Sequence, residues 1–214
     1  MRIILLGAPG TGKGTHAQFI IKKYKIPQIS TGEMFRKAIK LDSKIGRQVK
    51  KVLSIGQLVP DELVIQLVNH RLSENDCSRG FLLDGFPRTI AQALSIREMG
   101  IKIDKILEFV VPDQLIINRI TGRRIHEASG RIYHSIFNPP KITGQDDITG
   151  EPLIIREDDK IETIHHRLIE YRHLTAPLIH YYQQEACLGN TTYHKINGAR
   201  TISEINNELI KLCE

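Results

Sequence analysis

The chain has 214 residues, of which 41% are hydrophobic and 25% are charged, which is the ordinary composition of a globular domain in water. No apolar run approaches the length of a membrane span, so we expect no membrane association. The net charge is +6, but the basic residues are scattered among acidic ones and aromatic residues make up only 6% of the chain. We therefore expect no nucleic-acid partner, since a small polyanion accounts for the surplus if several arginines converge on one pocket.

The three cysteines, Cys77, Cys187 and Cys213, are far apart and odd in number. They predict neither a disulfide framework nor a metal-ligand pair, which indicates a reducing, cytoplasmic location. The first apolar run ends at Gly7, so we expect no signal peptide there.

A glycine-rich segment follows that apolar run and precedes an amphipathic stretch. Residues 1–6 predict a strand, and Gly7–Thr15 form the glycine-rich segment. Residues 16–23 are the amphipathic part of a helix whose first turn is expected to begin near Lys13, within that segment. Gly7, Gly12 and Lys13 match the G-x-x-x-x-G-K pattern of a phosphate-binding loop. Glycines let backbone N–H groups approach phosphate oxygens, and the helix dipole favours negative charge at the same place.

The residue after the lysine departs from the general pattern. Gly14 stands where Ser or Thr is common, and the hydroxyl comes one residue later at Thr15. This ending is less typical of GTPases and indicates a small nucleotide kinase.

Residues 26–30 predict a second short strand, and the next segment predicts helices. Ser30 is the expected N-cap of a helix with Glu33 completing a capping box, and Arg36 lies off the apolar stripe of that helix. A further helix over 43–53 and a loop at 56–61 complete a small helical excursion between core elements. Asp61 and Glu62 open the following helix, to about residue 72, as its dipole prefers.

A buried strand at 81–83 leads into the second informative stretch. Asp84 follows the strand directly, where open α/β sheets place their ligand sites and where an acid can hold Mg²⁺ directly or through water. The turn after Asp84 presents Arg88. Residues 104–111 predict a third apolar strand, and residues 112–121 a helix that carries Arg119.

The rest of the core is predicted from the C-terminal part. Residues 161–186 read as a long helical stretch that Pro177 kinks or interrupts. A last strand is expected at 191–196, and an amphipathic helix follows Thr201. The histidines show no paired ligand pattern, and we interpret them as surface or core residues.

Several motifs in this order resemble adenylate kinase, in its long bacterial form, over essentially the whole chain. The segments that carry the resemblance are Gly7–Thr15, Ser30–Arg36, Leu83–Arg88, Gly122–Arg124, Tyr133–Pro140, and Arg156 with Asp158 and Asp159.

The resemblance implies the α/β fold of the P-loop nucleoside monophosphate kinases: a five-stranded parallel sheet flanked by helices, with a helical AMP-binding insertion and a β-rich lid. The implied boundaries are 30–59 for the AMP-binding insertion, 122–159 for the lid, and 1–29, 60–121 and 160–214 for the core. The implied substrates are ATP, AMP and ADP with Mg²⁺, and a monomer is expected.

The resemblance also implies roles for individual residues. The implied ATP-site positions are Gly10, Thr11, Gly12, Lys13, Gly14, Thr15, Arg119, Arg123, Ile132, Tyr133 and Arg200. The implied AMP-site positions are Thr31, Arg36, Gln57, Leu58, Val59, Gly85, Phe86, Pro87, Arg88, Gln92, Arg156 and Arg167. The residues expected to act on the transferring phosphoryl group are Lys13, Arg36, Arg88, Arg123, Arg156 and Arg167, and the Mg²⁺ is expected on Thr15 or Asp84 through water.

Two pairs of polar residues in the expected lid have the same spacing, with two residues between the members of each pair: His126 with Ser129, and Asp146 with Thr149. A zinc ribbon would place Cys at most of these four positions, and none is Cys. The resemblance implies a quartet, His126, Ser129, Asp146 and Thr149, that forms hydrogen bonds instead, so we predict no structural zinc. Four unrelated polar loop residues remain the alternative.

Phosphoryl transfer to a monophosphate needs no general base, because the acceptor oxygen is already ionised. It needs alignment, neutralisation of charge and exclusion of water. The predicted reaction is ATP + AMP = 2 ADP. Two alternatives stay open: a kinase for another nucleoside monophosphate, and a nucleotide-binding or nucleic-acid-binding protein that transfers no phosphate.

Overall fold

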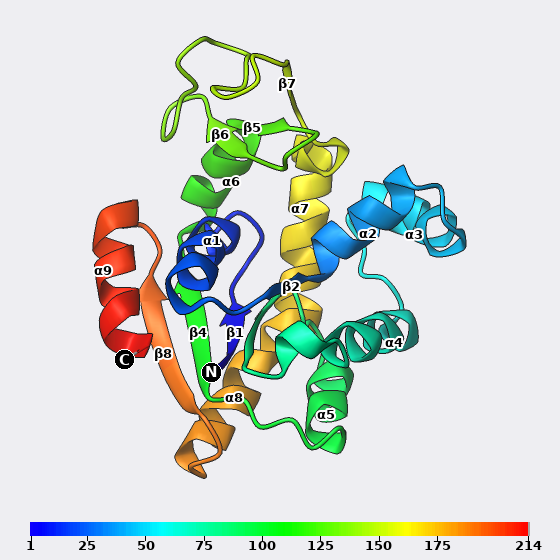
Figure 1. The fold of residues 1–214 in the computed structure, drawn as a ribbon, viewed down its shortest axis with the longest axis vertical. Coiled ribbons are helices and arrows are strands. Elements are labelled where there is room, and N and C mark those ends of the chain that lie inside the picture. Colours follow the sequence, from blue (N-terminus) through cyan, green and yellow to red (C-terminus); the bar gives the residue numbers. More distant parts are fainter. Residues whose placement is uncertain (214) are drawn as a thin grey trace.

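The computed structural model of the protein describes residues 1–213, apart from the side chain of residue 157. Its centre is a sheet of five parallel strands in the order β2-β3-β1-β4-β8 (Figure 1). The strands are β1 (Arg2–Leu6), β2 (Gln28–Ser30), β3 (Phe81–Asp84), β4 (Lys105–Val110) and β8 (Thr192–Asn197). The predicted α/β fold with a five-stranded parallel sheet is confirmed.

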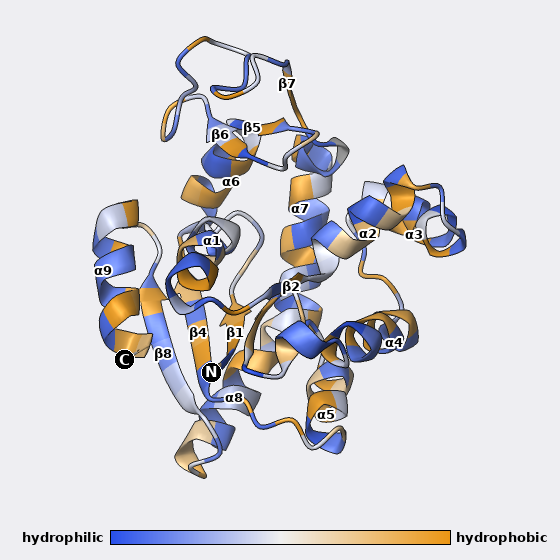
Figure 2. Cartoon of the chain, viewed as in Figure 1, coloured by the Kyte–Doolittle hydropathy of each residue, from blue (hydrophilic) through white to orange (hydrophobic). Residues whose placement is uncertain are grey.

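The sheet forms because its strands are apolar on both faces, as parallel strands covered by helices require. In β1, Ile3 and Leu5 pack into one hydrophobic cluster while Ile4 and Leu6 pack into the other. Figure 2 shows β1 and β4 largely in hydrophobic colours. These four side chains are each at most 2% exposed, and burial of each contributes roughly 1.5–3 kcal/mol to folding. The strand that carries the phosphate loop is therefore held rigidly.

Seven α-helices and one short 3₁₀ turn, η1 (Asn75–Cys77), cover this sheet within the described chain. The helices are α1 (Lys13–Tyr24), α4 (Asp61–Leu72), α5 (Ile90–Glu98), α6 (Asp113–Thr121), α7 (Ile161–Glu170), α8 (Pro177–Cys187) and α9 (Ile202–Cys213). Helices α1 and α9 contact each other, while α5 packs against α4 and α8 (Figure 1).

The predicted interruption of the long C-terminal helical stretch is confirmed. A π-helical segment, η3 (Tyr171–Thr175), joins α7 to α8, and Pro177 is the first residue of α8. The N–H of Ala176 donates to the carbonyl of Tyr171, five residues earlier, at 2.8 Å. Because proline has no N–H and its ring crowds the preceding turn, the chain widens just before it.

Two helices project away from the sheet to the right of Figure 1: α2 (Thr31–Lys40) and α3 (Lys44–Ser54). Ser30 caps α2 as predicted, since its hydroxyl accepts from the N–H of Glu33 at 3.4 Å. Ser43 caps α3 in the same way and also donates to the carbonyl of Ala38 at 3.0 Å. The two helices are thus tied into one unit by hydrogen bonds as well as by packing.

A second, small sheet stands at the top of Figure 1. It consists of three antiparallel strands in the order β6-β5-β7, namely β5 (Arg123–His126), β6 (Ile132–His134) and β7 (Leu153–Ile154). A 3₁₀ turn, η2 (Glu157–Asp159), returns the chain to α7. Both projecting parts flank the carboxyl ends of the central strands.

Gly46 is where α3 approaches α2 most closely. An added Cβ would lie 2.1 Å from the carbonyl oxygen of Ala38, in a part of the backbone that cannot yield cheaply. We predict that Gly46→Ala lowers the free energy of unfolding by about 1–3 kcal/mol, although alanine normally favours a helix by about 1 kcal/mol over glycine. Thermal unfolding measures this, with the exposed Gln48→Ala as control. Equal midpoints for the two variants would contradict the packing argument.

Candidate active site

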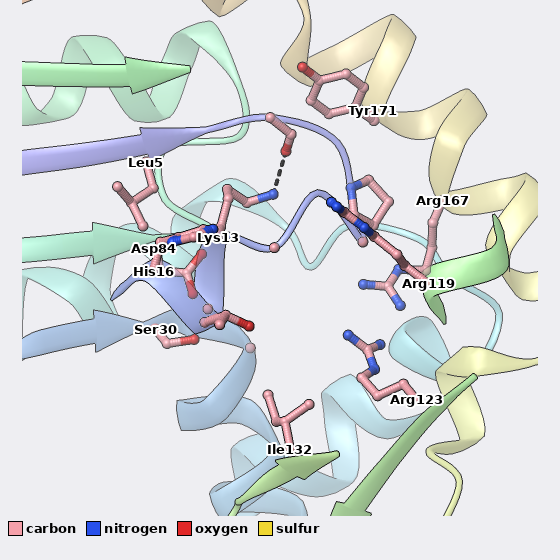
Figure 3. Close-up of a pocket in the computed structure, with 18 of the residues that line it drawn as sticks. Leu5, Lys13, His16, Ser30, Asp84, Arg119, Arg123, Ile132, Arg167 and Tyr171 are labelled. Atoms are coloured by element: carbon pink, nitrogen blue, oxygen red, sulfur yellow. Dashed lines mark hydrogen bonds between the residues drawn. The ribbon is translucent and has the colours of Figure 1, made fainter. Parts of the chain in front are cut away.

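A cavity of about 650 Å³ opens at the carboxyl ends of the central strands. Its walls come from the loop after β1, the start of α2, the end of β3, the small sheet, α6, α7 and the loop before α9 (Figure 3). This is the edge where open parallel sheets bind ligands, and the volume falls within the range of ligand pockets.

The loop after β1 closes around the side chain of Lys13. The ammonium donates to the carbonyl of Gly7 at 2.6 Å (Figure 3). It also donates to the carbonyl of Ala8 at 2.7 Å and lies 3.3 Å from the hydroxyl of Thr11. Gly12 takes a φ of +93° at the start of α1, a conformation that glycine adopts freely. Since Gly12 has no side chain to cap the helix, the first N–H groups of α1 remain available to an anion.

Burial and like charge depress the pKa of several cations around this cavity. Burial lowers the pKa of Lys13 to about 8, with neighbouring arginines adding to the effect against Asp84. Burial, followed by repulsion from Arg167, lowers the pKa of Arg88 to about 10. Burial also lowers the pKa of Arg156 to about 9, aided by Arg36 and Arg123. A polyanion would relieve this repulsion, so the site has a built-in affinity for negative charge.

Two adjacent aspartates hold part of the arginine cluster in place. Arg123 pairs with Asp159 through both oxygens, one at 2.8 Å, and Arg167 donates to the carboxylate of Asp158 at 2.9 Å. Burial alone would raise the pKa of Asp158, but Arg167 and the arginines around it outweigh burial and lower that pKa. These carboxylates therefore hold the guanidinium groups of Arg123 and Arg167 in place in the structure without a ligand.

Arg119 and Arg200 line the part of the cavity next to α9. The guanidinium of Arg119 lies 6.0 Å from the ring centre of Phe137 and donates to the carbonyl of Thr11 at 3.4 Å. Arg200 pairs with Glu208 on α9. A flat cation beside an aromatic ring is a surface on which a nucleobase can stack.

Asp84 and Thr15 offer oxygen ligands to a hard cation. The carboxylate of Asp84 lines the cavity at the end of β3, close to Gly14, and accepts from the amide of Gln28 at 3.1 Å. Thr15 lines the same cavity. A carboxylate and a hydroxyl beside a phosphate loop fit Mg²⁺, which keeps several waters and takes few protein ligands.

A smaller cavity of about 30 Å³ adjoins the large one beneath α2 and shares Leu58, Gly85 and Arg88 with it. Thr31, Gln57, Val59 and Gln92 line this smaller cavity as well. Most of the residues singled out in the sequence thus gather around two adjoining cavities. Those lining the large one are Gly10, Gly12, Lys13, Gly14, Thr15, Arg36, Leu58, Asp84, Gly85, Pro87, Arg88, Arg119, Arg123, Ile132, Tyr133, Arg156, Arg167 and Arg200.

Two predicted binding residues do not line either cavity. The side chain of Phe86 is fully buried in the hydrophobic core, where its apolar ring is more stable than at a charged site. Thr11 is 2% exposed, and its hydroxyl donates to the carbonyl of Ala8 at 2.9 Å. Thr11 therefore supports the shape of the phosphate loop from within.

The cavity also contains residues that sequence reasoning missed. His16 lines it, stacks on Phe109 with ring centres 5.4 Å apart, and contacts Asn206 through Nδ1 at 2.9 Å. Burial lowers the pKa of His16. Its place directly after Thr15 was the available signal. Phe137 projects from the small sheet and had no signal, because nothing local to it indicates that Arg119 lies opposite.

The predicted quartet, His126 at the end of β5 and Ser129, Asp146 and Thr149 in the loops beside the small sheet, forms one hydrogen-bonded network with Arg131, Tyr133 and Glu151. Asp146 accepts from Thr149 at 3.0 Å, from Tyr133 at 3.0 Å, and from Arg131 at 2.7 and 2.6 Å. Nδ1 of His126 contacts Ser129 at 2.7 Å, and Nε2 contacts Glu151 at 2.5 Å. The hydrogen bond from Arg131 outweighs burial and holds the pKa of Asp146 far below its usual range.

Among the side chains that the structure describes, no group of three or more His, Cys, Asp and Glu is arranged to hold a metal ion. Across the same part of the chain, no helix combines the length and the apolar character needed to cross a bilayer.

The parallel sheet, the phosphate loop at its first strand and the cations around two adjoining cavities define a nucleoside monophosphate kinase, a transferase that acts on nucleotides. Comparison with known protein families supports the same class, since the family model described as "Adenylate kinase" matches residues 5–187. The chain belongs to the adenylate kinase family.

The depressed pKa of Lys13 gives a test in the absence of ligand. Because its folded pKa of about 8 lies below the ordinary 10.5, protonated Lys13 destabilises the native state at neutral pH, and this cost disappears as the pH rises from about 8 to 10.5. We predict that the free energy of unfolding of the native chain, relative to Lys13→Met, rises by roughly 1–3 kcal/mol over that interval.

Urea unfolding at several pH values measures the difference, and the groups common to both proteins cancel in the comparison. Parallel pH profiles would contradict a buried, destabilised ammonium. Saturating ATP should reverse the ranking at pH 7, because the anion compensates Lys13.

Proposed function

We propose that the protein catalyses the reversible, Mg²⁺-dependent reaction ATP + AMP = 2 ADP. The observation that supports this best is the convergence of Lys13 and several half-buried arginines on a cavity that has the phosphate loop at one end and α2 at the other. A protein that only binds one nucleotide has no use for two sets of phosphate-binding cations. The donor would lie against the phosphate loop and the acceptor beneath α2.

The donor nucleotide would be held by the backbone N–H groups of Gly10–Thr15 and by Lys13, with its base beside Arg119 and Arg200. Thr15 and Asp84 would hold Mg²⁺ through water, and the ion would neutralise charge between the outer phosphates. When the donor nucleotide binds, the ammonium of Lys13 would leave the carbonyls of Gly7 and Ala8 and move to the phosphates. The side chain of Lys13 is flexible and long enough to reach either set of oxygens.

The acceptor phosphate would be held by Arg36 and Arg88, and its base would lie near Thr31 and Gln92. An acceptor phosphate oxygen attacks the γ-phosphorus of ATP, and the bond from that phosphorus to the β-bridging oxygen breaks, which leaves ADP on both sides. Arg123, Arg156 and Arg167 would stabilise the charge of the transferring group, since each fork can bind two oxygens.

Residues 30–59 and 122–159 are proposed to move as an AMP-binding insertion and a lid that close over the core, segments 1–29, 60–121 and 160–214. Closure excludes water, which competes with AMP as acceptor. Lys40 on α2 and Glu127 in the lid lie 4.0 Å apart, a contact that joins the two movable parts directly. We further propose that opening limits turnover, and that the protein acts as a cytoplasmic monomer without nucleic acid.

The direct test offers MgATP with AMP, CMP, UMP or GMP and resolves the products by chromatography. We expect rapid ADP formation with AMP and little transfer to the other three acceptors. Preferred transfer to a pyrimidine monophosphate would still identify the protein as a nucleoside monophosphate kinase but would refute AMP as its acceptor. Folded protein that binds ATP but transfers to none of them would refute the proposed reaction.

The two arginines at the start of β5 form a matched pair for testing the lid. Arg123 lines the cavity and pairs with Asp159, whereas Arg124 donates to the carbonyls of Thr121 and of Arg123. We predict that Arg123→Ala lowers kcat by about 10²–10³-fold, the effect of removing one charge-stabilising donor. Arg124→Ala should lower it less than tenfold, and equal losses would contradict the assignment of Arg123 to the reacting phosphates.

A further inference from the structure

Two side chains beside the smaller cavity have their hydrogen-bonding directions fixed by their neighbours. The carboxamide of Gln92 is 1% exposed and is held at both ends. Its oxygen accepts from the backbone N–H of Arg88 at 2.7 Å, and its nitrogen donates to Oδ1 of Asp61 at 2.7 Å.

Neither neighbour permits the reverse orientation of that carboxamide. A backbone N–H can only donate, so it must face the amide oxygen, and a carboxylate can only accept, so it must face the amide nitrogen. The other oxygen of Asp61 accepts from the hydroxyl of Thr89 at 2.9 Å, and that hydroxyl accepts from the backbone N–H of Gln92 at 3.2 Å. Asp61, at the start of α4, is thus locked to the first turn of α5. What remains of Gln92 for a ligand is one N–H and one lone pair, on fixed sides.

Thr31 is fixed in the same way. Thr31 is only 2% exposed, and its hydroxyl donates to the carbonyl of Gly85 at 2.9 Å. The proton is therefore committed, and Thr31 can offer a ligand only the lone pairs of its oxygen. Thr31 and Gln92 line the same small cavity.

We propose that Asp61 is a positioning residue for base selection: together with the backbone N–H of Arg88, it fixes the Gln92 carboxamide so that the subsite prefers a 6-amino purine monophosphate over a 6-oxo one. The two bases present reversed edges, a 6-amino donor beside the N1 acceptor in adenine and a 6-oxo acceptor beside an N1–H donor in hypoxanthine. A carboxamide with fixed sides matches one edge only. Thr31 decides which, because an acceptor favours an amino group and repels a carbonyl oxygen.

This inference rests on the proposed AMP reaction and concerns a residue outside the phosphate-binding machinery. Its test compares AMP with IMP, which share ribose and phosphate and differ at the 6-position and N1. Any disturbance of Arg88 affects both acceptors alike, so the ratio of kcat/KM for AMP to that for IMP isolates recognition of the base. Calorimetric titration with each monophosphate alone gives the same ratio without turnover.

We expect the wild-type protein to favour AMP, and Asp61→Ala to reduce the AMP-to-IMP ratio about tenfold, the contribution of one hydrogen bond. Glu62→Ala is the matched control, since it also removes a carboxylate from the first turn of α4 but leaves Gln92 held. Asp61→Asn serves if the alanine variant unfolds. It keeps the shape but offers Gln92 and Thr89 only one oxygen between them, so the ratio should fall by a smaller factor.

An unchanged ratio in the folded Asp61 variants, or an equal fall in Glu62→Ala, would overturn the positioning role. Wild-type protein that uses AMP and IMP equally would leave the proposed reaction standing and refute this inference. Wild-type protein that phosphorylates neither would refute the proposed reaction, and the inference with it.

Discussion

The arrangement of the molecule follows from one electrostatic constraint, the cost of holding many positive charges together away from water. Lys13, Arg88, Arg156 and Arg167 all have lowered pKa values because burial and mutual repulsion penalise their charged forms. Such a cluster persists only if the surrounding fold is stable enough to impose it. The buried strands of the central sheet provide that stability, and the acids Asp158 and Asp159 neutralise part of the charge in the ligand-free state.

The same constraint explains why the cations come from different parts of the chain. Lys13 stands on the rigid core, Arg36 and Arg123 on the two projecting parts, and Arg167 on α7 between them. If all of them belonged to one rigid element, their repulsion would act permanently. In the proposed closure, this distribution over separate units would let the repulsion fall when the units move apart, and bound phosphates would draw them together. Binding of the polyphosphate and closure would then be one thermodynamic event.

The sequence was sufficient for those features that depend on local patterns. The phosphate loop, the Ser30 cap, the buried strand before Asp84 and the interruption near Pro177 each follow from a few adjacent residues. The sequence was insufficient where a side chain has a choice of distant partners. Nothing near Gln92 indicates that Asp61 holds it, and nothing near Asp146 indicates Arg131 and Tyr133 as its donors. Phe86 was grouped with its neighbours in a binding turn, whereas alternation of direction along the chain turned its ring into the core.

The π-helical segment between α7 and α8 has a consequence for helical phase. A residue inserted into an α-helix rotates everything beyond it by about 100°, because a turn contains 3.6 residues. The wide π-helical turn at Tyr171–Thr175 accommodates one extra residue while the helical stretch from α7 to α8 stays continuous. It lets Arg167 on α7 and Tyr171 at the start of the π-helical segment face the cavity while α8 directs Leu178 and Tyr182 into the core. Its C-terminal residue, Thr175, donates to the carbonyl of Arg88 at 2.9 Å, so the place where the helical phase changes is also tied to a residue that lines the cavity. Shortening this segment by one residue would restore a uniform helix but would turn one of its two halves to the wrong side.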